Sequence, residues 1–228
     1  MGHAIGAYFG KGSRLLIGRD VRLGGDMILI SLTSGLLAEG VKVYDSGLLP
    51  TPALQFGIKS LGFDGGVMIT ASHNPPEYNG IKVISNDGIE IPHENEDIIE
   101  NYYFNNYSSK MEWRSYDNDV KIKENIIDLY IDGVLSQVDV EKIAKKNFRV
   151  VMDCANSVGS LTAPLLLRKL GVKAYTLNCN LDPYFPGRNP EPNADTLQNT
   201  MSYITLVKAD AGFAHDGDAD RAMVLDNN

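Results

Sequence analysis

The chain has 228 residues, 43% of them hydrophobic and 22% charged, which is the composition of a globular protein large enough for two domains. Its formal net charge of −8 argues against a surface that binds nucleic acid or an anionic membrane, because no basic block offsets it. No apolar run reaches about eighteen residues, so no segment is expected to span a bilayer. We expect a cytoplasmic location.

Strands and helices are expected to alternate along the first part of the chain. The opening residues 1–6 already have the pattern of the middle of a helix. Apolar runs and helical spacings bounded by glycine, proline or asparagine predict the following elements. They are a strand at 15–18, a helix at 24–38, a strand at 41–44, a helix at 52–60, strands at 66–70 and 81–84, a hairpin turn at 86–88 leading into 89–91, and helices at 94–104 and 124–138. The polar segment 108–119 is expected to be an exposed connection.

The same alternation of strands and helices begins again after residue 148. The predicted elements are strands at 149–152, 173–177, 211–214 and 222–225, helices at 158–170 and 196–208, and an irregular proline-rich loop at 182–192. Alternation of this kind predicts α/β architecture. We expect two successive α/β layered domains with mixed, mostly parallel sheets, covering residues 1–143 and 144–228.

The two cysteines, Cys154 and Cys179, have no metal-ligand spacing and form no C-x-x-C arrangement. We expect them to be two small buried residues on strands, packed as ordinary members of a core.

A serine follows the strand predicted at 66–70, within the segment TASHNP at residues 70–75. Prolines after Asn74 force the chain to bend, and loops at the carboxyl ends of strands form the ligand crevice of α/β proteins. Ser72 is therefore a candidate nucleophile, and the alternative is a turn serine that bonds its own backbone. A serine needs activation, for which His73 and Lys82 are candidates. Lys82 can act as a base if cations or burial lower its pKa; otherwise it is an ordinary strand lysine.

Three aspartates alternate in the segment DGDADR at residues 216–221. Alternate positions of an extended chain point the side chains of Asp216, Asp218 and Asp220 in the same direction. Carboxylates this close repel one another unless a cation neutralises them. An oxygen-only ligand set favours Mg²⁺. An EF-hand loop is excluded because its glycine and glutamate positions hold other residues, which leaves a solvated acidic turn as the alternative. Arg221 is placed to clamp a phosphate beside such an ion.

Together these segments resemble the α-D-phosphohexomutase superfamily, and its phosphoglucomutase/phosphomannomutase group in particular. Residues 70–75 are similar to the phosphoserine loop of that family and residues 216–221 to its magnesium loop. The segments YNGIK at 78–82, GRDVR at 18–22 and FPGRNPEP at 185–192 are further family marks. The similarity extends over nearly the whole chain, with the motifs in the family's order.

The resemblance implies a four-domain architecture around one cleft, of which this chain would supply domain one and most of domain two. It implies that Ser72 carries a phosphate whose oxygen joins Asp216, Asp218 and Asp220 around one Mg²⁺. The phosphoserine would donate to a hexose monophosphate, and the resulting hexose 1,6-bisphosphate would return its other phosphate to Ser72.

The resemblance also implies roles for five further side chains around the serine. Lys82 corresponds to the general acid/base of the family, and His73 and Arg221 are expected to assist catalysis beside the transferred phosphate. Arg19 and Arg188 are expected to bind substrate.

Two departures from the family pattern stand out. The usual amino-terminal segment is absent, and the chain stops just after the magnesium loop. We therefore expect an incomplete piece of a mutase, weak or inactive alone, whose parent interconverts hexose 1-phosphate and hexose 6-phosphate. Pro76 and Tyr78 favour glucose or mannose over glucosamine. The alternatives are a non-catalytic phosphosugar-binding module and a phosphosugar hydrolase using the same serine, and the oligomeric state is left open.

Overall fold

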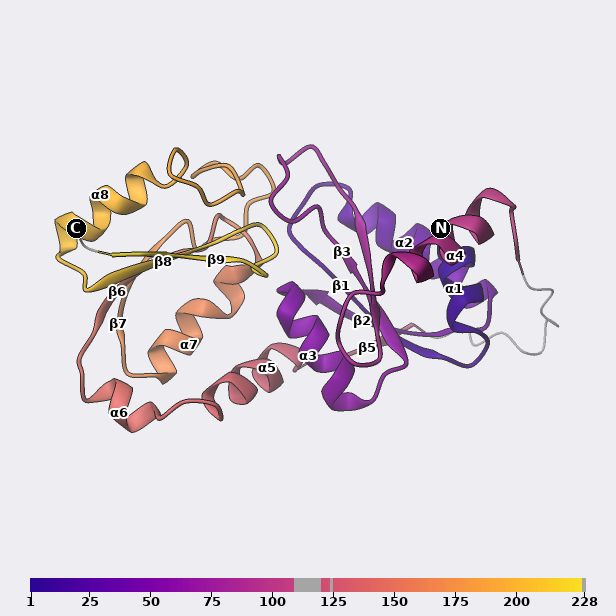
Figure 1. The fold of residues 1–228 in the computed structure, drawn as a ribbon, viewed down its shortest axis with the longest axis horizontal. Helices are drawn as coiled ribbons and strands as arrows, with labels where there is room; N and C mark the ends of the chain where they lie inside the picture. Colours follow the sequence, from indigo (N-terminus) through magenta and orange to yellow (C-terminus); the bar gives the residue numbers. More distant parts are fainter. Residues whose placement is uncertain (109–119, 124, 227–228) are drawn as a thin grey trace.

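A computed structural model describes residues 1–108, 120–123 and 125–226 (Figure 1). It contains two α/β units in succession, each built around its own mixed, mostly parallel sheet, as the sequence predicts. Within these described ranges, no helix has both the length and the apolar character needed to cross a membrane. The division predicted between residues 143 and 144 falls at the end of helix α6 (Val140–Ala144), and its exact position stays a prediction.

The first sheet has the strand order β4-β3-β1-β2-β5. Its strands are β1 (Arg14–Arg19), β2 (Lys42–Leu48), β3 (Gly65–Ile69), β4 (Ile81–Ser85) and β5 (Lys121–Ile122). All neighbours pair in parallel except β3 and β4, which are antiparallel. The central strand β1 is therefore flanked by β2 and β3, and the carboxyl ends of all three lie at one edge of the sheet.

Helices cover both faces of this sheet. They are α1 (Gly2–Phe9), α2 (Gly25–Ala38), α3 (Thr51–Leu61), α4 (His93–Phe104) and α5 (Ile126–Leu135). In β1, Leu15 and Ile17 pack with α1, α2 and α4, whereas Leu16 between them packs with α3 and α5. A strand buried on both faces explains the uninterrupted apolar run in this part of the sequence.

The second sheet repeats the plan with the order β7-β6-β8-β9. Its strands are β6 (Arg149–Asp153), β7 (Lys173–Leu177), β8 (Ala211–His215) and β9 (Ala222–Leu225), and only β9 runs antiparallel to its neighbour. Helices α7 (Ala163–Lys169) and α8 (Gln198–Val207) cover opposite faces (Figure 1). Val151 of β6 packs with α8 and the adjacent Met152 with α7.

The predicted elements differ from the structure in four places, one of which is β5, a strand that the sequence did not predict. The helix expected at 124–138 ends at Leu135, and α6 follows, with Asp139 capping it by accepting a hydrogen bond from Lys142 N at 2.9 Å. The helix expected at 158–170 begins as a 3₁₀ turn over Val158–Leu161. The hairpin after residue 88 forms only a single bridge between Ile84 and Glu90. Most of the connection expected at 108–119 lies outside the described residues.

The two cysteines were expected to be small core residues on strands; they lie just after strands instead, and a covalent bond that the sequence did not predict joins them. Cys154 follows β6, Cys179 follows β7, and a disulfide joins them with a Cα–Cα distance of 4.9 Å. Both residues do pack in the core of the second unit, as expected. The bond depends on the pairing of β6 with β7, because the carboxyl ends of adjacent parallel strands bring the two residues together.

Candidate active site and metal centre

The serine turn begins where β3 ends. Ser72 is 5% exposed and has a left-handed backbone with φ of 49°, a conformation that costs a non-glycine residue about 1–2 kcal/mol. Its backbone N–H donates to Thr70 Oγ1 at 2.8 Å. Its hydroxyl donates to Asp216 Oδ2 at 2.7 Å, although 144 positions separate the two residues. The candidate nucleophile and the acidic loop therefore meet, across the junction of the two units.

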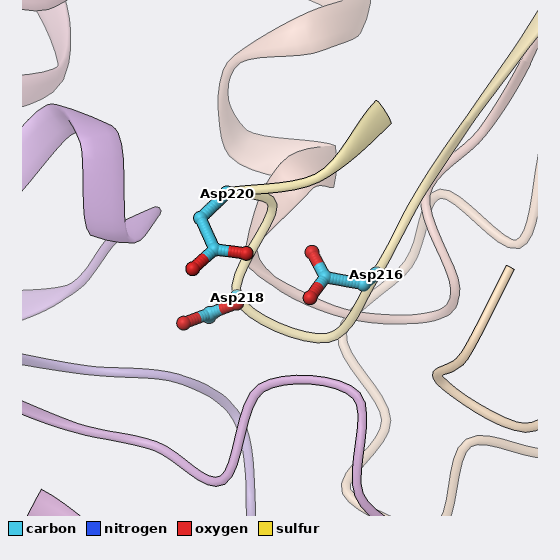
Figure 2. Close-up of side chains that lie close together, drawn as sticks. All are labelled: Asp216, Asp218 and Asp220. Carbon is cyan, nitrogen blue, oxygen red and sulfur yellow. The ribbon is translucent and has the colours of Figure 1, made fainter. Parts of the chain in front are cut away.

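The acidic loop connects β8 to β9. Figure 2 shows Asp216, Asp218 and Asp220 on this loop with their carboxylates gathered close together. Each residue offers an oxygen that lies within 4.8 Å of the oxygens offered by the other two. Asp216 and Asp218 are completely buried, whereas Asp220 is partly exposed. The period-two spacing thus brings three carboxylates together, as the alternation of the aspartates predicts.

The electrostatics of this loop fit a bound cation. Burial and the nearby charge of Asp218 raise the pKa of Asp216 to about 7, although the hydrogen bond from Ser72 opposes the shift. Among the described residues, Asp218 Oδ1 is a buried oxygen without a hydrogen-bond partner. A divalent ion would bind that oxygen and offset the repulsion, and carboxylate oxygens alone suit Mg²⁺.

Lys82, on β4, contacts the same carboxylates. Its Nζ lies 2.8 Å from Asp220 Oδ2, 3.3 Å from Asp218 Oδ2 and 3.1 Å from Glu90 Oε1. Burial alone would lower the pKa of Lys82, but the charges of Asp218 and Asp220 outweigh it and raise the pKa. This direction is opposite to the one expected for a lysine base, because the neighbours of Lys82 are anions and not cations. The structure therefore favours a protonated Lys82.

His73 and Arg221 lie together at the exposed rim of the site. Arg221 Nη2 donates to His73 Nδ1 at 2.6 Å, and Arg221 Nη1 lies 3.5 Å from Glu191 Oε2. The Arg221 side chain keeps 47% of its surface exposed while its Nε stands 3.8 Å from Asp220 Oδ1. The guanidinium is thus available to an anion that approaches the acidic loop.

The two arginines expected to bind substrate occupy different environments. Arg19 pairs with Asp26 at 2.7 Å, and its Nη1 lies 3.7 Å from Asp45, beyond hydrogen-bond distance. It also lines a surface hollow of about 370 Å³ together with Leu48. Arg19 therefore retains a donor for a ligand.

Arg188 is buried, at 9% exposure, and its guanidinium is occupied. Its Nε donates to Asp153 Oδ2 at 3.0 Å, its Nη1 to the carbonyls of Asn189 and Pro190, and its Nη2 to the carbonyl of His215. This position does not support the substrate-binding role suggested by its proline-rich loop. It supports a structural role, because the guanidinium ties that loop to the start of the acidic loop.

Among the residues that contact the site, Thr51 and Arg22 were not singled out from the sequence. Thr51, the first residue of α3, donates from its hydroxyl to Asp218 Oδ2 at 2.7 Å and from its backbone N–H to the Asp218 carbonyl at 3.0 Å. Arg22 is 3% exposed and donates to the carbonyl of Ser72. A threonine at a helix start reads as an ordinary cap, so no local signal marks Thr51. Arg22 belongs to the GRDVR segment, which the sequence marked as similar to the family without assigning a role to Arg22.

Two family models match the chain in succession. Residues 1–110 match the phosphoglucomutase/phosphomannomutase α/β/α domain I, and residues 128–228 match domain II of the same family. The chain belongs to this phosphohexomutase family. The serine loop therefore lies in the part that matches domain I, and the acidic loop in the part that matches domain II.

The family's curated members include mutases of several named substrates. The chain is 54% identical over 98% of its length to a phosphoglucosamine/phosphogalactosamine mutase of Sulfurisphaera tokodaii, of which it covers 49%. It is 45% identical over 94% of its length to a phosphoglucomutase/phosphomannomutase of Thermococcus kodakarensis, of which it covers 46%. The chain thus spans about half the length of these relatives.

A solved structure of the family has the same fold. The crystal structure of a protein described as a putative phosphomannomutase from Thermus thermophilus superposes with a TM-score of 0.85 at 27% identity. The match covers 99% of this chain and 52% of that one. The arrangement of the two α/β units is therefore that of the first half of a phosphohexomutase.

Proposed function

We propose that the chain supplies the phosphoserine and the metal-binding loop of a phosphohexomutase that interconverts hexose 1-phosphate and hexose 6-phosphate. One observation carries the proposal: the hydroxyl of Ser72 lies 2.7 Å from Asp216, within a cluster of three carboxylates contributed by the other α/β unit. An ordinary turn serine has no reason to be held against a repulsive acidic cluster. A serine that carries a phosphate beside a cation does.

The reaction proposed at Ser72 is a phosphoryl transfer in both directions. In one direction, Ser72 Oγ forms a bond to a phosphorus of hexose 1,6-bisphosphate, the bond from that phosphorus to the sugar oxygen breaks, and a hexose monophosphate remains. The hydroxyl proton of Ser72 passes to Asp216 Oδ2, which already accepts its hydrogen bond. Protonated Lys82, beside Asp218 and Asp220, is placed to give a proton to the sugar oxygen, and both protons move back in the reverse step. Arg221 and His73, at the rim, are placed to contact the phosphate.

Asp216, Asp218 and Asp220 are the side chains that would hold Mg²⁺, together with an oxygen of the phosphate on Ser72. When bound, the ion would neutralise part of the charge on the transferring phosphoryl group. Thr51 and Lys82 keep Asp218 and Asp220 in place by direct contacts. The protein would mostly orient the serine and the phosphate, as is general for this class of reaction.

For the substrate, the glucose and mannose phosphates indicated by Pro76 and Tyr78 are our first candidates. Amino-sugar phosphates are the second, because the 54% identical relative is named a phosphoglucosamine/phosphogalactosamine mutase. The proposed substrate is a phosphorylated sugar in either case, and hexose 1,6-bisphosphate is the proposed intermediate.

Intact-mass spectrometry tests the proposal. The chain is incubated with Mg²⁺ and glucose 1,6-bisphosphate, and Ser72→Ala is the control. A stable phosphate on Ser72 that glucose 1-phosphate or glucosamine 1-phosphate removes supports a mutase and ranks the two sugars. A phosphate lost to water supports the hydrolase, and no phosphorylation supports a binding module. The proposal places phosphoryl acceptance by Ser72 in this chain, whatever its turnover as an incomplete mutase, so either result would overturn it.

A further inference from the structure

Arg22 is the most completely engaged cation beside Ser72. Its guanidinium packs over the ring of Phe185 at 5.2 Å, and its Nε donates to Asp20 Oδ2 at 3.0 Å. Asp20 is 2% exposed and also accepts a hydrogen bond from Thr70 Oγ1 at 2.7 Å. One buried carboxylate therefore holds both the arginine and the threonine that contact the serine.

The remaining donors of Arg22 all bind backbone carbonyls of the serine loop. Nη2 donates to Ser72 O at 2.6 Å and Asn74 O at 2.8 Å, and Nη1 donates to Pro75 O at 2.6 Å and Tyr78 O at 3.2 Å. Only a planar, forked cation can meet four carbonyls in this way, since a lysine offers a single nitrogen. The two consecutive prolines of this loop supply no N–H groups, so Arg22 provides donors that the backbone lacks at those positions.

These contacts bracket Ser72 on both sides. Thr70 Oγ1 accepts a hydrogen bond from Ser72 N, and Arg22 donates one to Ser72 O. Thr70 and Arg22 both donate in turn to Asp20. The serine is held in a left-handed conformation between them. A Cβ added at Gly217 of the acidic loop would collide with Ser72 O and crowd Arg22 Nη2. The guanidinium therefore lies at the point where the serine loop and the acidic loop touch.

The second unit contains a matching arrangement. Asp153, at the end of β6, accepts hydrogen bonds from Arg188 Nε at 3.0 Å and from Thr200 Oγ1 at 2.6 Å. Arg188 in turn donates to the carbonyl of His215, the residue before the acidic loop. Both aspartates lie at the carboxyl end of a central strand of their sheet, β1 or β6. One buried Asp–Arg–Thr group thus serves the nucleophile, and the other serves the metal ligands.

We propose that Arg22 is a positioning residue for phosphoryl transfer, which fixes the Ser72 hydroxyl relative to the acidic loop, and that Arg188 is its counterpart for the metal ligands. This inference rests on the proposed function of Ser72. It assigns the two arginines separable effects. Loss of the Arg22 guanidinium slows phosphoryl transfer to Ser72, and loss of the Arg188 guanidinium lowers the affinity of the acidic loop for Mg²⁺.

The test compares Arg22→Lys, Arg188→Lys and the half-exposed control Arg149→Lys, all of which keep the positive charge. Phosphorylation of Ser72 by glucose 1,6-bisphosphate is followed by quenched-flow mass spectrometry, and MgCl₂ affinity by calorimetry. We expect Arg22→Lys to slow phosphorylation about 10- to 100-fold with wild-type Mg²⁺ affinity, because small misplacements of reacting groups cost this much. We expect Arg188→Lys to weaken Mg²⁺ binding and Arg149→Lys to change neither quantity.

Two further variants, both at Thr70, test the inference if Arg22→Lys does not fold. Thr70→Ala removes the acceptor of Ser72 N, whereas Thr70→Ser keeps the hydroxyl, so the alanine variant should show slow phosphorylation and the serine variant should restore it. Wild-type phosphorylation rates in Arg22→Lys, or in Thr70→Ala, would overturn the inference. So would equal losses of both quantities in the two arginine variants. Absence of phosphorylation in the wild-type chain would instead overturn the proposed function.

Discussion

The hydrogen bond from Ser72 to Asp216 places a hydroxyl in contact with a carboxyl group whose pKa is raised to about 7. Burial is the main cause, and the charge of Asp218 adds to it. In the ion-free protein this arrangement disfavours the folded state once Asp216 is ionised. A bound cation would reverse that effect, so stability and ion binding would be coupled through one carboxylate.

Asp216→Asn should stabilise the ion-free protein at pH 8 and reduce its affinity for Mg²⁺. A carboxyl group whose folded pKa lies above its unfolded value of 3.8 binds more protons when folded, so wild-type stability falls as the pH rises through the range from about 4 to 7. The variant lacks this loss, and a gain of about 1 kcal/mol corresponds to about 2–4 °C in Tm. Thermal unfolding in EDTA at pH 5 and pH 8 measures it. An unchanged pH dependence in the variant would contradict the expectation.

At the scale of single elements, helix α3 holds the acidic loop from the other unit. Thr51, at its first position, binds Asp218 with both its hydroxyl and its backbone N–H. The side chain therefore orients a candidate metal ligand, and contacts of this kind tune metal affinity.

Thr51→Val keeps the size and the backbone N–H of the residue but removes the hydroxyl. We expect Mg²⁺ affinity to fall about 10-fold or more, because Asp218 loses the group that orients it. Thr51→Ser is the matched control and should bind nearly as well as wild type. Calorimetric titration compares the three proteins, and equal affinities would show that α3 does not orient the carboxylate.

The disulfide joins the carboxyl ends of strands β6 and β7 and stabilises this pair of strands. It joins residues 25 positions apart, and a loop of this length contributes about 3 kcal/mol to stability in the chain-entropy account. Cys179→Ser, or reduction of the wild type, should therefore lower Tm by several degrees. Thiol labelling in denaturant supplies the chemical check: both cysteines should react only after reduction. Labelling before reduction would contradict the bond.

At the scale of the whole molecule, the candidate site belongs to neither unit alone. Ser72, Lys82 and Thr51 come from the first sheet and its helices, and each contacts an aspartate of the second. The junction of the two units is therefore polar and charged, and its stability should respond to whatever neutralises the three carboxylates.

Mg²⁺ should accordingly protect both loops together from hydrogen–deuterium exchange. We expect slower exchange in residues 70–80 and in residues 216–221 at saturating Mg²⁺, because the ion relieves repulsion at the surface they share. Asp220→Asn serves as the control and should reduce the protection in both segments. Protection confined to residues 216–221 would show that the two units respond independently.

The sequence predicted those parts of the site's chemistry that depend on residues close together along the chain. The alternation of three aspartates, the serine after a buried strand and the rhythm of strands and helices are local patterns, and the fold class and family follow from them. The Cys154–Cys179 bond, the burial of Arg188 and the contacts of Thr51 had no such signal, and the GRDVR segment marked Arg22 without indicating its contacts. They depend on which strands become neighbours.

The amino-acid sequence by itself thus determined the kinds of groups present: a hydroxyl on a bend, three carboxylates on one side of a loop, and α/β layers around them. The family resemblance implied that these groups meet, and the tertiary structure shows their contact. Only the tertiary structure decided that anions surround Lys82 and raise its pKa, and that one guanidinium holds the serine loop while another holds the acidic loop. The physical reason is distance along the chain. Contacts between residues as far apart as Ser72 and Asp216 depend on the packing of two units, which no local pattern encodes.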